Sequence, residues 1–202
     1  MFCKQVFDKV VSFLGLVVLS WLYVLLMILI WLDSKSSVFY VQKRVGKDGE
    51  LFNCHKFRTM KEGCDDSPIC ISGDDRVTSI GSFLRRYHLD ELPQLWDVFI
   101  GKMSFVGPRP DVPGYADRLE GEDRAILKLR PGITGPASLK YRNEEEILAK
   151  VKDPRRYNDE VIYPDKVRLN LYYLEHYSFW IDIKIIFATV LGKTIVYNGE
   201  RI

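Results

Sequence analysis

The 202-residue sequence has only four cysteines and three histidines, and this scarcity limits the metal chemistry that it can support. No two cysteines form a C-x-x-C pair and no segment indicates export, so we expect reduced thiols. Cys64 and Cys70 enclose two aspartates, but their spacing fits no common zinc pattern. The histidines lie too far apart in the sequence to be read as metal ligands. These absences argue against a zinc site and against a disulfide framework.

A strong net charge is also absent. The chain has 29 lysines and arginines against 27 acidic residues, which gives a formal net charge of +2. Because so small a charge does not attract a polyanion through its overall field, we expect no nucleic-acid partner, and any anion must be bound by local basic clusters. Internal repeats and low-complexity tracts are missing as well, so residues 34–202 are expected to form one globular domain.

The feature present in excess is an uncharged apolar run, residues 10–32, bounded by Lys9 and Asp33. As a helix rising ~1.5 Å per residue it is about 34 Å long, enough to cross a hydrocarbon core of about 30 Å. The run exceeds the ~7–15 apolar residues of a signal peptide and no small-x-small cleavage site follows it, so we expect it to remain attached. Basic residues on both flanks favour a helix that enters and leaves one membrane face, with a single span as the alternative.

Two adjacent acids, Asp90 and Glu91, stand shortly before a proline that can open a helix. Pro93 is tolerated in a first helical turn because its missing N–H has no partner there in any case. Apolar residues then recur at helical spacing: Leu92, Leu95, Trp96 and Phe99. We therefore expect both acids at a helix N-terminus, where unpaired N–H groups and the helix dipole favour carboxylates and bound phosphate. A plain N-cap is the alternative interpretation of Asp90.

Basic residues converge on this acidic pair in the sequence. Arg85 and Arg86 lie just upstream, and Arg109 follows within Pro108-Arg109-Pro110. Arginine binds phosphate through a planar fork of donors. Acids and arginines gathered in one short region therefore indicate a site for a phosphorylated substrate more strongly than they indicate a simple helix cap.

Upstream of the acids, the pattern is typical of a β hairpin. Alternating β-rich residues at 38–42 and a second β-rich run at 51–57 flank a glycine-containing turn at 46–49. The second strand carries Lys56 and leads to Arg58. These two basic residues either face solvent from the strand or bind substrate.

Downstream of the acids, we expect a helix near residues 117–129, a glycine-rich turn at 130–136 whose N–H groups could hold a phosphate, and a helix that begins at the acidic run 144–146. Near the C-terminus, tyrosines and Trp180 precede an apolar helix that reaches Val190. Such residues suit the headgroup level of a bilayer, and a buried core helix with a tyrosine rim is the equal alternative.

These segments, in this order, resemble the bacterial sugar transferase family, specifically its small monotopic phosphoglycosyl transferases. The resemblance extends over nearly the whole chain. It implies an α+β fold, in which a mostly helical catalytic domain with a small β hairpin, residues 34–202, is mounted on an N-terminal re-entrant membrane helix, residues 1–33. The matching pieces are the apolar helix, Asp33-Ser34, Val38 to Gly46, Lys56 to Met60, Leu89 to Trp96, Met103 to Pro110, Arg130 to Gly135 and Ser178 to Ile186.

The resemblance also implies a reaction and a location. Such enzymes transfer a phosphosugar from a nucleotide-diphosphate sugar, here expected to be a UDP-sugar, to polyprenol (undecaprenyl) phosphate, which yields polyprenol-diphosphate-sugar and UMP. This is the first membrane step of polysaccharide and glycoconjugate biosynthesis. It places the protein on the lipid bilayer at the cytoplasmic face of the bacterial inner membrane. It implies nothing about which sugar is transferred or about the oligomeric state.

Carried onto this sequence, the resemblance makes Asp90 the nucleophile that attacks the sugar-side phosphate and forms a covalent intermediate. Glu91, together with Asp90, is expected to hold Mg²⁺, a hard cation that takes carboxylate oxygens and neutralises phosphate charge. Contacts with the phosphates and the rest of the substrate are expected from five basic residues: Arg85, Arg109, Lys56, Arg58 and Arg130.

The chain departs from the family pattern in its membrane segment. The Ser-Pro pair that bends the family's helix is Ser20-Trp21 here, so a straighter helix is the alternative to a re-entrant one. Two other functions compete with the transferase. A membrane-anchored phosphatase that used Asp90 would pass the phosphoryl group to water, and a non-catalytic scaffold would not need arginines gathered around two acids.

Overall fold

The computed structural model describes residues 2–61, 63 and 76–202, and the segment that contains Cys64 and Cys70 lies outside these residues. The described part is mostly helical with small sheets, which confirms the expected α+β class. After the N-terminal helices, the α-helices are α3 (Ser79–Arg86), α4 (Gln94–Phe99), α5 (Pro136–Lys140), α6 (Glu144–Ala149), α7 (Pro154–Tyr157), α8 (Tyr163–Glu175) and α9 (Phe179–Val190). The strands are β1 (Phe39–Val45), β2 (Leu51–Phe57), β3 (Ser104–Val106), β4 (Gly132–Thr134), β5 (Val196–Tyr197) and β6 (Glu200–Arg201). Short 3₁₀ helices span Lys47–Gly49, Leu89–Glu91, Ala116–Arg118 and Asp123–Lys128, and a π-helical turn spans Asn158–Ile162.

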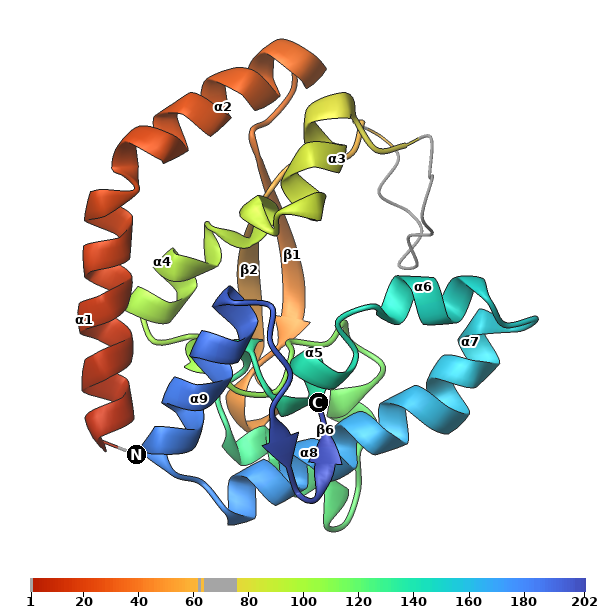
Figure 1. Ribbon diagram of the computed structural model, residues 1–202. Helices are drawn as coiled ribbons and strands as arrows, with labels where there is room; N and C mark the ends of the chain where they lie inside the picture. Colours follow the sequence, from red (N-terminus) through yellow and green to blue (C-terminus); the bar gives the residue numbers. More distant parts are fainter. Residues whose placement is uncertain (1, 62, 64–75) are drawn as a thin grey trace.

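Two helices, α1 (Phe2–Val18) and α2 (Ser20–Ser34), form a bent pair along one side of the molecule (Figure 1). They meet at an angle of 62° across a break at Leu19. No helix in the described ranges is by itself long and apolar enough to cross a bilayer, whereas this pair together has the required length and composition. A straight helix through the apolar run is therefore wrong, although Trp21 stands where the family has a proline.

The bend follows from the different docking partners of the two helices. Helix α1 packs on α4, and Gly15 allows a close approach, since a Cβ there would lie 3.3 Å from Leu95 Cδ1. Helix α2 packs instead on α3, where Leu26 and Ile30 enter one cluster with Leu84. Each helix follows its own docking surface, so tertiary packing accounts for the angle between them.

Helix α1 turns polar side chains inward and apolar ones outward. Lys4, Asp8 and Ser12, spaced four residues apart, are all buried. Lys4 Nζ donates to Asp182 Oδ2 at 2.7 Å, and Ser104 Oγ donates to Asp8 Oδ2 at 2.8 Å. This inverted pattern is typical of a helix whose outer face meets lipid. The outward side chains are large and apolar: Val6, Val10, Phe13, Leu14 and Val17.

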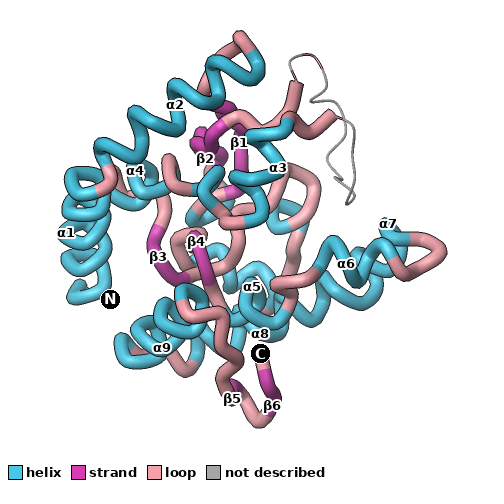
Figure 2. The backbone as a smooth tube through the Cα atoms, turned by 45° about the horizontal axis from the view of Figure 1, so that its top comes forward, coloured by secondary structure: helices cyan, strands magenta, loops and turns pink. Residues whose placement is uncertain are grey.

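At the centre of the fold, β3 and β4 run parallel to each other (Figure 2). The glycine-rich turn at 130–136 allows the two strands to approach this closely. Any side chain at Gly132 would clash, because its Cβ would lie 2.2 Å from the backbone nitrogen of Gly107. The Gly132 N–H donates to Pro108 O at 2.7 Å. This N–H is therefore used inside the fold, where it fixes the chain next to Arg109.

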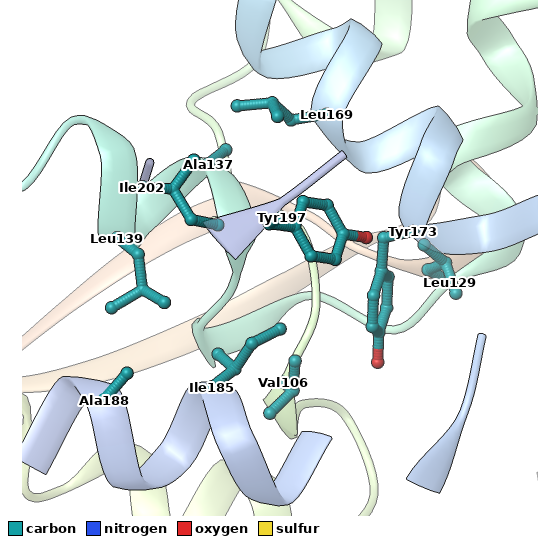
Figure 3. Packing of buried hydrophobic residues seen from close by; sticks show 10 residues of the cluster. All are labelled: Val106, Leu129, Ala137, Leu139, Leu169, Tyr173, Ile185, Ala188, Tyr197 and Ile202. Atoms are coloured by element: carbon teal, nitrogen blue, oxygen red, sulfur yellow. The ribbon is translucent and has the colours of Figure 1, made fainter. Parts of the chain in front are cut away.

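The main hydrophobic core lies against these strands, between α5, α8 and α9 (Figure 3). Ile185 and Ala188 of α9 are buried in it with Tyr173 of α8. The interpretation of this last helix as a core helix is therefore correct for its inner face. Its outer face is exposed although apolar, with Trp180 73% and Phe187 60% accessible. That outer face keeps the composition expected at a bilayer surface.

The β1–β2 pair is antiparallel and confirms the predicted hairpin, with Phe39 opposite Phe57 and Val45 opposite Leu51. Its turn uses a positive φ at Asp48, which is 59°. Phe52, Cys54 and Phe57 of β2 are buried, so the strand is packed at both its middle and its end, next to Lys56.

Two helix predictions further along the chain had different outcomes. The acidic run 144–146 begins α6, as expected. The helix predicted at 117–129 is wrong, because two separate 3₁₀ helices form there. Leu119 is extended and Gly121 has a φ of 57°, so helical geometry is interrupted between them. The Arg124 guanidinium donates to Leu119 O at 3.2 Å, and this hydrogen bond joins the second 3₁₀ helix to the end of the first.

Candidate active site

A short turn between α3 and α4 carries the two acids. His88 adopts a left-handed conformation with a φ of 54° and leads into the 3₁₀ turn Leu89–Glu91. The leucines on either side of the acids, Leu89 and Leu92, pack into the cluster beneath α2. Pro93 then caps α4, so the acids lie in the turn immediately before the helix and not in its first turn.

Glu91 is held by two cations, and these three residues are called the Glu91 cluster below. Lys56 Nζ and Arg109 Nη2 each lie 2.7 Å from Glu91 Oε1. Burial alone would raise the pKa of Glu91, but Arg109 and Lys56 outweigh burial and hold that pKa well below its ordinary value. Glu91 in turn raises the pKa of Arg109. Glu91 and Arg109 are therefore both ionised at neutral pH.

Asp90 lies beside the Glu91 cluster, 9% exposed, and no side chain in the described part of the chain donates a hydrogen bond to it. Burial raises the pKa of Asp90; the charge of Lys56 opposes this effect and the charge of Glu91 adds to it. Arg85 and Arg109 also favour the ionised form. A carboxylate that accepts no hydrogen bond from the described side chains, next to cations that stabilise its charge, is suited to attack a phosphorus atom.

Arg85 is oriented from the last turn of α3. Its Nε donates to Thr59 Oγ1 at 2.9 Å, just beyond the end of β2. Helix α3 lies very close to this segment, since a Cβ on Gly81 would lie 2.1 Å from Thr59 O. Thr78 caps the helix by accepting the Gly81 N–H at 2.9 Å. The structure thus brings Arg85, Lys56 and Arg109 around the acids, and their roles toward a substrate stay predictions.

The acids also fit a divalent cation. Among the residues that the structure describes, no group of three His, Cys, Asp or Glu side chains is suited to a metal. Mg²⁺ does not require such a group, since it is commonly bound by one or two carboxylates together with substrate phosphates and water. Lys56 and Arg109 share one oxygen of Glu91, Oε1, which leaves Oε2 and the Asp90 carboxylate as oxygen donors.

Comparison with known proteins decides the family. A family model described as bacterial sugar transferase matches residues 1–195. The chain belongs to the bacterial sugar transferase family. It is 33% identical over 204 residues to the exopolysaccharide production protein ExoY of Sinorhizobium fredii (strain NBRC 101917 / NGR234), and this match covers 93% of the chain and 83% of that protein.

Longer relatives share the same region. The UDP-glucose:undecaprenyl-phosphate glucose-1-phosphate transferase of Klebsiella pneumoniae is 34% identical over 193 residues, which cover 93% of this chain and 39% of that protein. The undecaprenyl-phosphate glucose phosphotransferase of Komagataeibacter xylinus is 37% identical over 205 residues, which cover 97% of this chain and 36% of that protein. The chain therefore spans well under half the length of these two relatives. This sugar transferase is an enzyme of the transferase class.

Two predicted substrate residues of this sugar transferase lie away from the Glu91 cluster. Arg58 Nε donates to Ser37 O at 2.9 Å, and its guanidinium lies 5.9 Å from the ring centroid of Tyr40. The Arg130 guanidinium lies beside Gly101, at the opposite end of α4 from the acids. Within the described residues the structure brings neither arginine to Asp90 or Glu91, so their substrate roles stay predictions.

A pair that sequence reasoning did not single out braces β2 against α4. The fully buried Asp97 accepts the His55 N–H at 2.9 Å and lies 2.6 Å from His55 Nδ1. Burial raises the pKa of Asp97, and the hydrogen bonds from His55 oppose this effect. Because His55 precedes Lys56, the pair fixes the strand that carries this lysine against the helix that follows the acids. In the sequence, the only indication of this pair is the acidic residue Asp97 inside the otherwise apolar run 95–99.

The segment that carries Arg109 is also tied down. Arg44 Nη1 donates to Pro110 O at 3.0 Å, and the Val45 N–H donates to Asp111 O at 2.9 Å. Burial raises the pKa of Asp111 to about 6, against the opposing charge of Lys166. These contacts with β1 hold the backbone from which Arg109 reaches Glu91.

Proposed function

We propose that this sugar transferase moves a phosphosugar from a UDP-sugar to undecaprenyl phosphate and releases UMP. The observation that supports the proposal best is the juxtaposition of Asp90 with the Glu91 cluster, which places a carboxylate among fixed cations suited to a diphosphate. The names of the Klebsiella and Komagataeibacter relatives both include undecaprenyl phosphate, and the first also includes UDP-glucose.

The proposed reaction has two displacement steps at one phosphorus atom. A carboxylate oxygen of Asp90 attacks the sugar-side phosphorus, a P–O bond to Asp90 forms, and the P–O bond to UMP breaks as UMP takes the electron pair. An oxygen of undecaprenyl phosphate then attacks the same phosphorus, forms the diphosphate bond and restores the Asp90 carboxylate. One nucleophile thereby serves a soluble donor and a membrane-bound acceptor in turn, which gives ping-pong kinetics.

The surrounding residues supply positive charge and orientation. Lys56, Arg85 and Arg109 present cations where negative charge develops on the transferring phosphoryl group. When bound, Mg²⁺ neutralises charge on the donor diphosphate, and Asp90 and Glu91 would hold it. The loss of either acid is therefore expected to weaken the donor step more than the fold.

We further propose that the protein sits on the cytoplasmic face of the bacterial plasma membrane, with α1 and α2 as a re-entrant pair. The bend between them and the inward-facing polar residues of α1 support this arrangement. Further exposed apolar side chains lie on α2, on α4 and on α9: Trp21, Ile28, Trp31, Trp96, Trp180 and Phe187. Contact of these side chains with lipid would bring the acceptor phosphate close to the acids, since α4 directly follows them.

A panel of nucleotide sugars tests the proposed reaction. With undecaprenyl phosphate and Mg²⁺, at least one uridine donor is expected to yield UMP continuously, and EDTA should stop its release. Without the acceptor, release should end at about one UMP per enzyme, because the covalent intermediate has nowhere to transfer its phosphosugar. Continued release without acceptor would indicate hydrolysis by a phosphatase. Failure to obtain UMP from any donor would contradict the proposal.

Cysteine labelling tests the re-entrant arrangement. Cys3 is an exposed native thiol at the start of α1, and Ser36→Cys would add a thiol just beyond α2. In sealed vesicles, with the other cysteines replaced, a membrane-impermeant maleimide should reach both positions from the same side. This result is expected because the bent pair returns the chain to the face from which it entered. Labelling from opposite sides would show that the pair spans the membrane.

A further inference from the structure

Tyr23 is unusual on α2 because it carries the only hydroxyl between Trp21 and Leu32. Its neighbours on the inner face of the helix are apolar, with Leu26 and Ile30 almost completely buried. A tyrosine hydroxyl in such surroundings requires a hydrogen-bond partner, because leaving it unpaired away from water is costly. Its partner lies on the turn that carries the acids.

The Tyr23 hydroxyl donates to the backbone carbonyl of Leu92, the residue directly after Glu91. The same carbonyl accepts the N–H of Leu95 at 3.0 Å. The hydrogen bond therefore joins α2 to the point at which the turn passes into α4. It lies among apolar side chains, where hydrogen bonds are stronger than in water.

The ring of Tyr23 contacts β2, the strand that carries Lys56 of the Glu91 cluster. Its centroid lies 5.5 Å from that of Phe57, which is 1% exposed. Phe57 directly follows Lys56, whose ammonium group lies 2.7 Å from Glu91 Oε1. One side chain of α2 thus contacts the chain neighbours of both members of the Lys56–Glu91 ion pair.

We infer that Tyr23 is a positioning residue through which helix α2 sets the geometry of the Asp90–Glu91 turn. The inference rests on the proposed function, since it concerns the step in which Asp90 attacks the donor. Tyr23 acts through Leu92 and Phe57, and it does not need to touch the substrate. In-line attack on phosphorus depends on the placement of the nucleophile, so a small displacement of the turn lowers the rate.

Tyr23→Phe tests this role because it keeps the ring and removes only the hydroxyl. Tyr157→Phe is the matched control, since it removes a hydroxyl from α7 at the far end of the molecule (Figure 1). The full chain, in nanodiscs of phosphatidylethanolamine and phosphatidylglycerol, is mixed with the active UDP-sugar and no acceptor. Tyr23→Phe should lower the rate constant of the UMP burst by about tenfold or more, with the burst amplitude and the donor affinity unchanged. The control should match the wild type in all three.

A purely structural role for Tyr23 predicts a different result. Partial unfolding would lower the burst amplitude and the melting temperature, while the enzyme that remained folded would react at the wild-type rate. An unchanged rate constant in Tyr23→Phe would therefore overturn the inference, whatever its stability.

Hydrogen exchange provides a readout that does not depend on activity. Peptides covering residues 89–99 should exchange faster in Tyr23→Phe than in the wild type and in Tyr157→Phe, because Leu92 O has lost a donor. Unchanged exchange in these peptides would overturn the inference even if the rate fell. If the wild type released no UMP from any donor, the proposed function would fail, and the exchange result alone would decide whether Tyr23 holds the turn.

Discussion

The Asp90→Asn enzyme is expected to lose turnover by more than about a thousandfold, because a carboxamide does not replace a carboxylate as a nucleophile. Its fold should persist, since no described side chain hydrogen-bonds to Asp90 and asparagine has nearly the same shape. Burial raises the pKa of Asp90 in the folded state above its value in the unfolded state. The ionisation of Asp90 therefore lowers the free energy of unfolding as the pH rises from the unfolded-state pKa through the folded-state pKa. The neutral amide avoids that cost. The variant should therefore melt at pH 7 at the wild-type temperature or above it.

Intact-protein mass spectrometry after mixing enzyme with donor alone measures the role of Asp90 directly. The wild type should gain the mass of the phosphosugar, and Asp90→Asn should not. Asp123→Asn, which changes an exposed aspartate on a 3₁₀ helix, is the matched control and should keep both turnover and the adduct. Near-normal turnover by Asp90→Asn, or a wild type that is never modified, would show that the double-displacement mechanism is wrong.

Removal of Asp182 is expected to lower the free energy of unfolding by about 3–5 kcal/mol, because it leaves the charge of Lys4 buried without its partner. Lys4 is 8% exposed and Asp182 is 2% exposed, and the ion pair between them joins α1 to α9. The hydroxyl of Tyr173 also donates to Asp182 and would lose its acceptor. The Asp182→Ala change should thus loosen the docking of α1 on the rest of the protein.

Denaturation of the detergent-solubilised protein, followed by tryptophan fluorescence, measures this effect. Adding Lys4→Met to Asp182→Ala removes the unpaired charge, so the double variant should be more stable than Asp182→Ala alone. Glu175→Ala, at an exposed position on α8, is the control for removing an acid and should change stability little. If the effects of the two single changes simply added, Lys4 and Asp182 would not be coupled and the explanation would be wrong.

The part of the candidate site that consists of residues close together in the chain could be predicted from the sequence. Asp90 and Glu91 are adjacent, and Arg85 lies only five residues before Asp90, so their proximity required little knowledge of the fold. The contact of Lys56 with Glu91 depends on how the β1–β2 hairpin packs against the turn, and there the family resemblance supplied the expectation. The family resemblance also implied a substrate role for Arg130, but the structure does not bring this residue to the acids.

The elements of the fold could be predicted where a short-range pattern governs them. Alternation and turn residues identified the β1–β2 hairpin because each strand buries one face. The helix expected at 117–129 does not form, because Gly121 takes a left-handed conformation that interrupts helical geometry. The bend at Leu19 was not encoded by a proline, and it arises because α1 and α2 dock on different surfaces.

The sequence by itself determined the family, through motifs that resemble it along the whole chain. It also determined the apolar N-terminal segment and the adjacent pair of acids, since these follow from composition and from residues close together in the chain. Only the tertiary structure decided that α1 faces the domain with its polar side, that His55 is braced by Asp97, and that the hydroxyl of Tyr23 reaches Leu92. These contacts join residues 42 or more positions apart. Their partners are chosen by how the helices and strands pack, which local preferences do not specify.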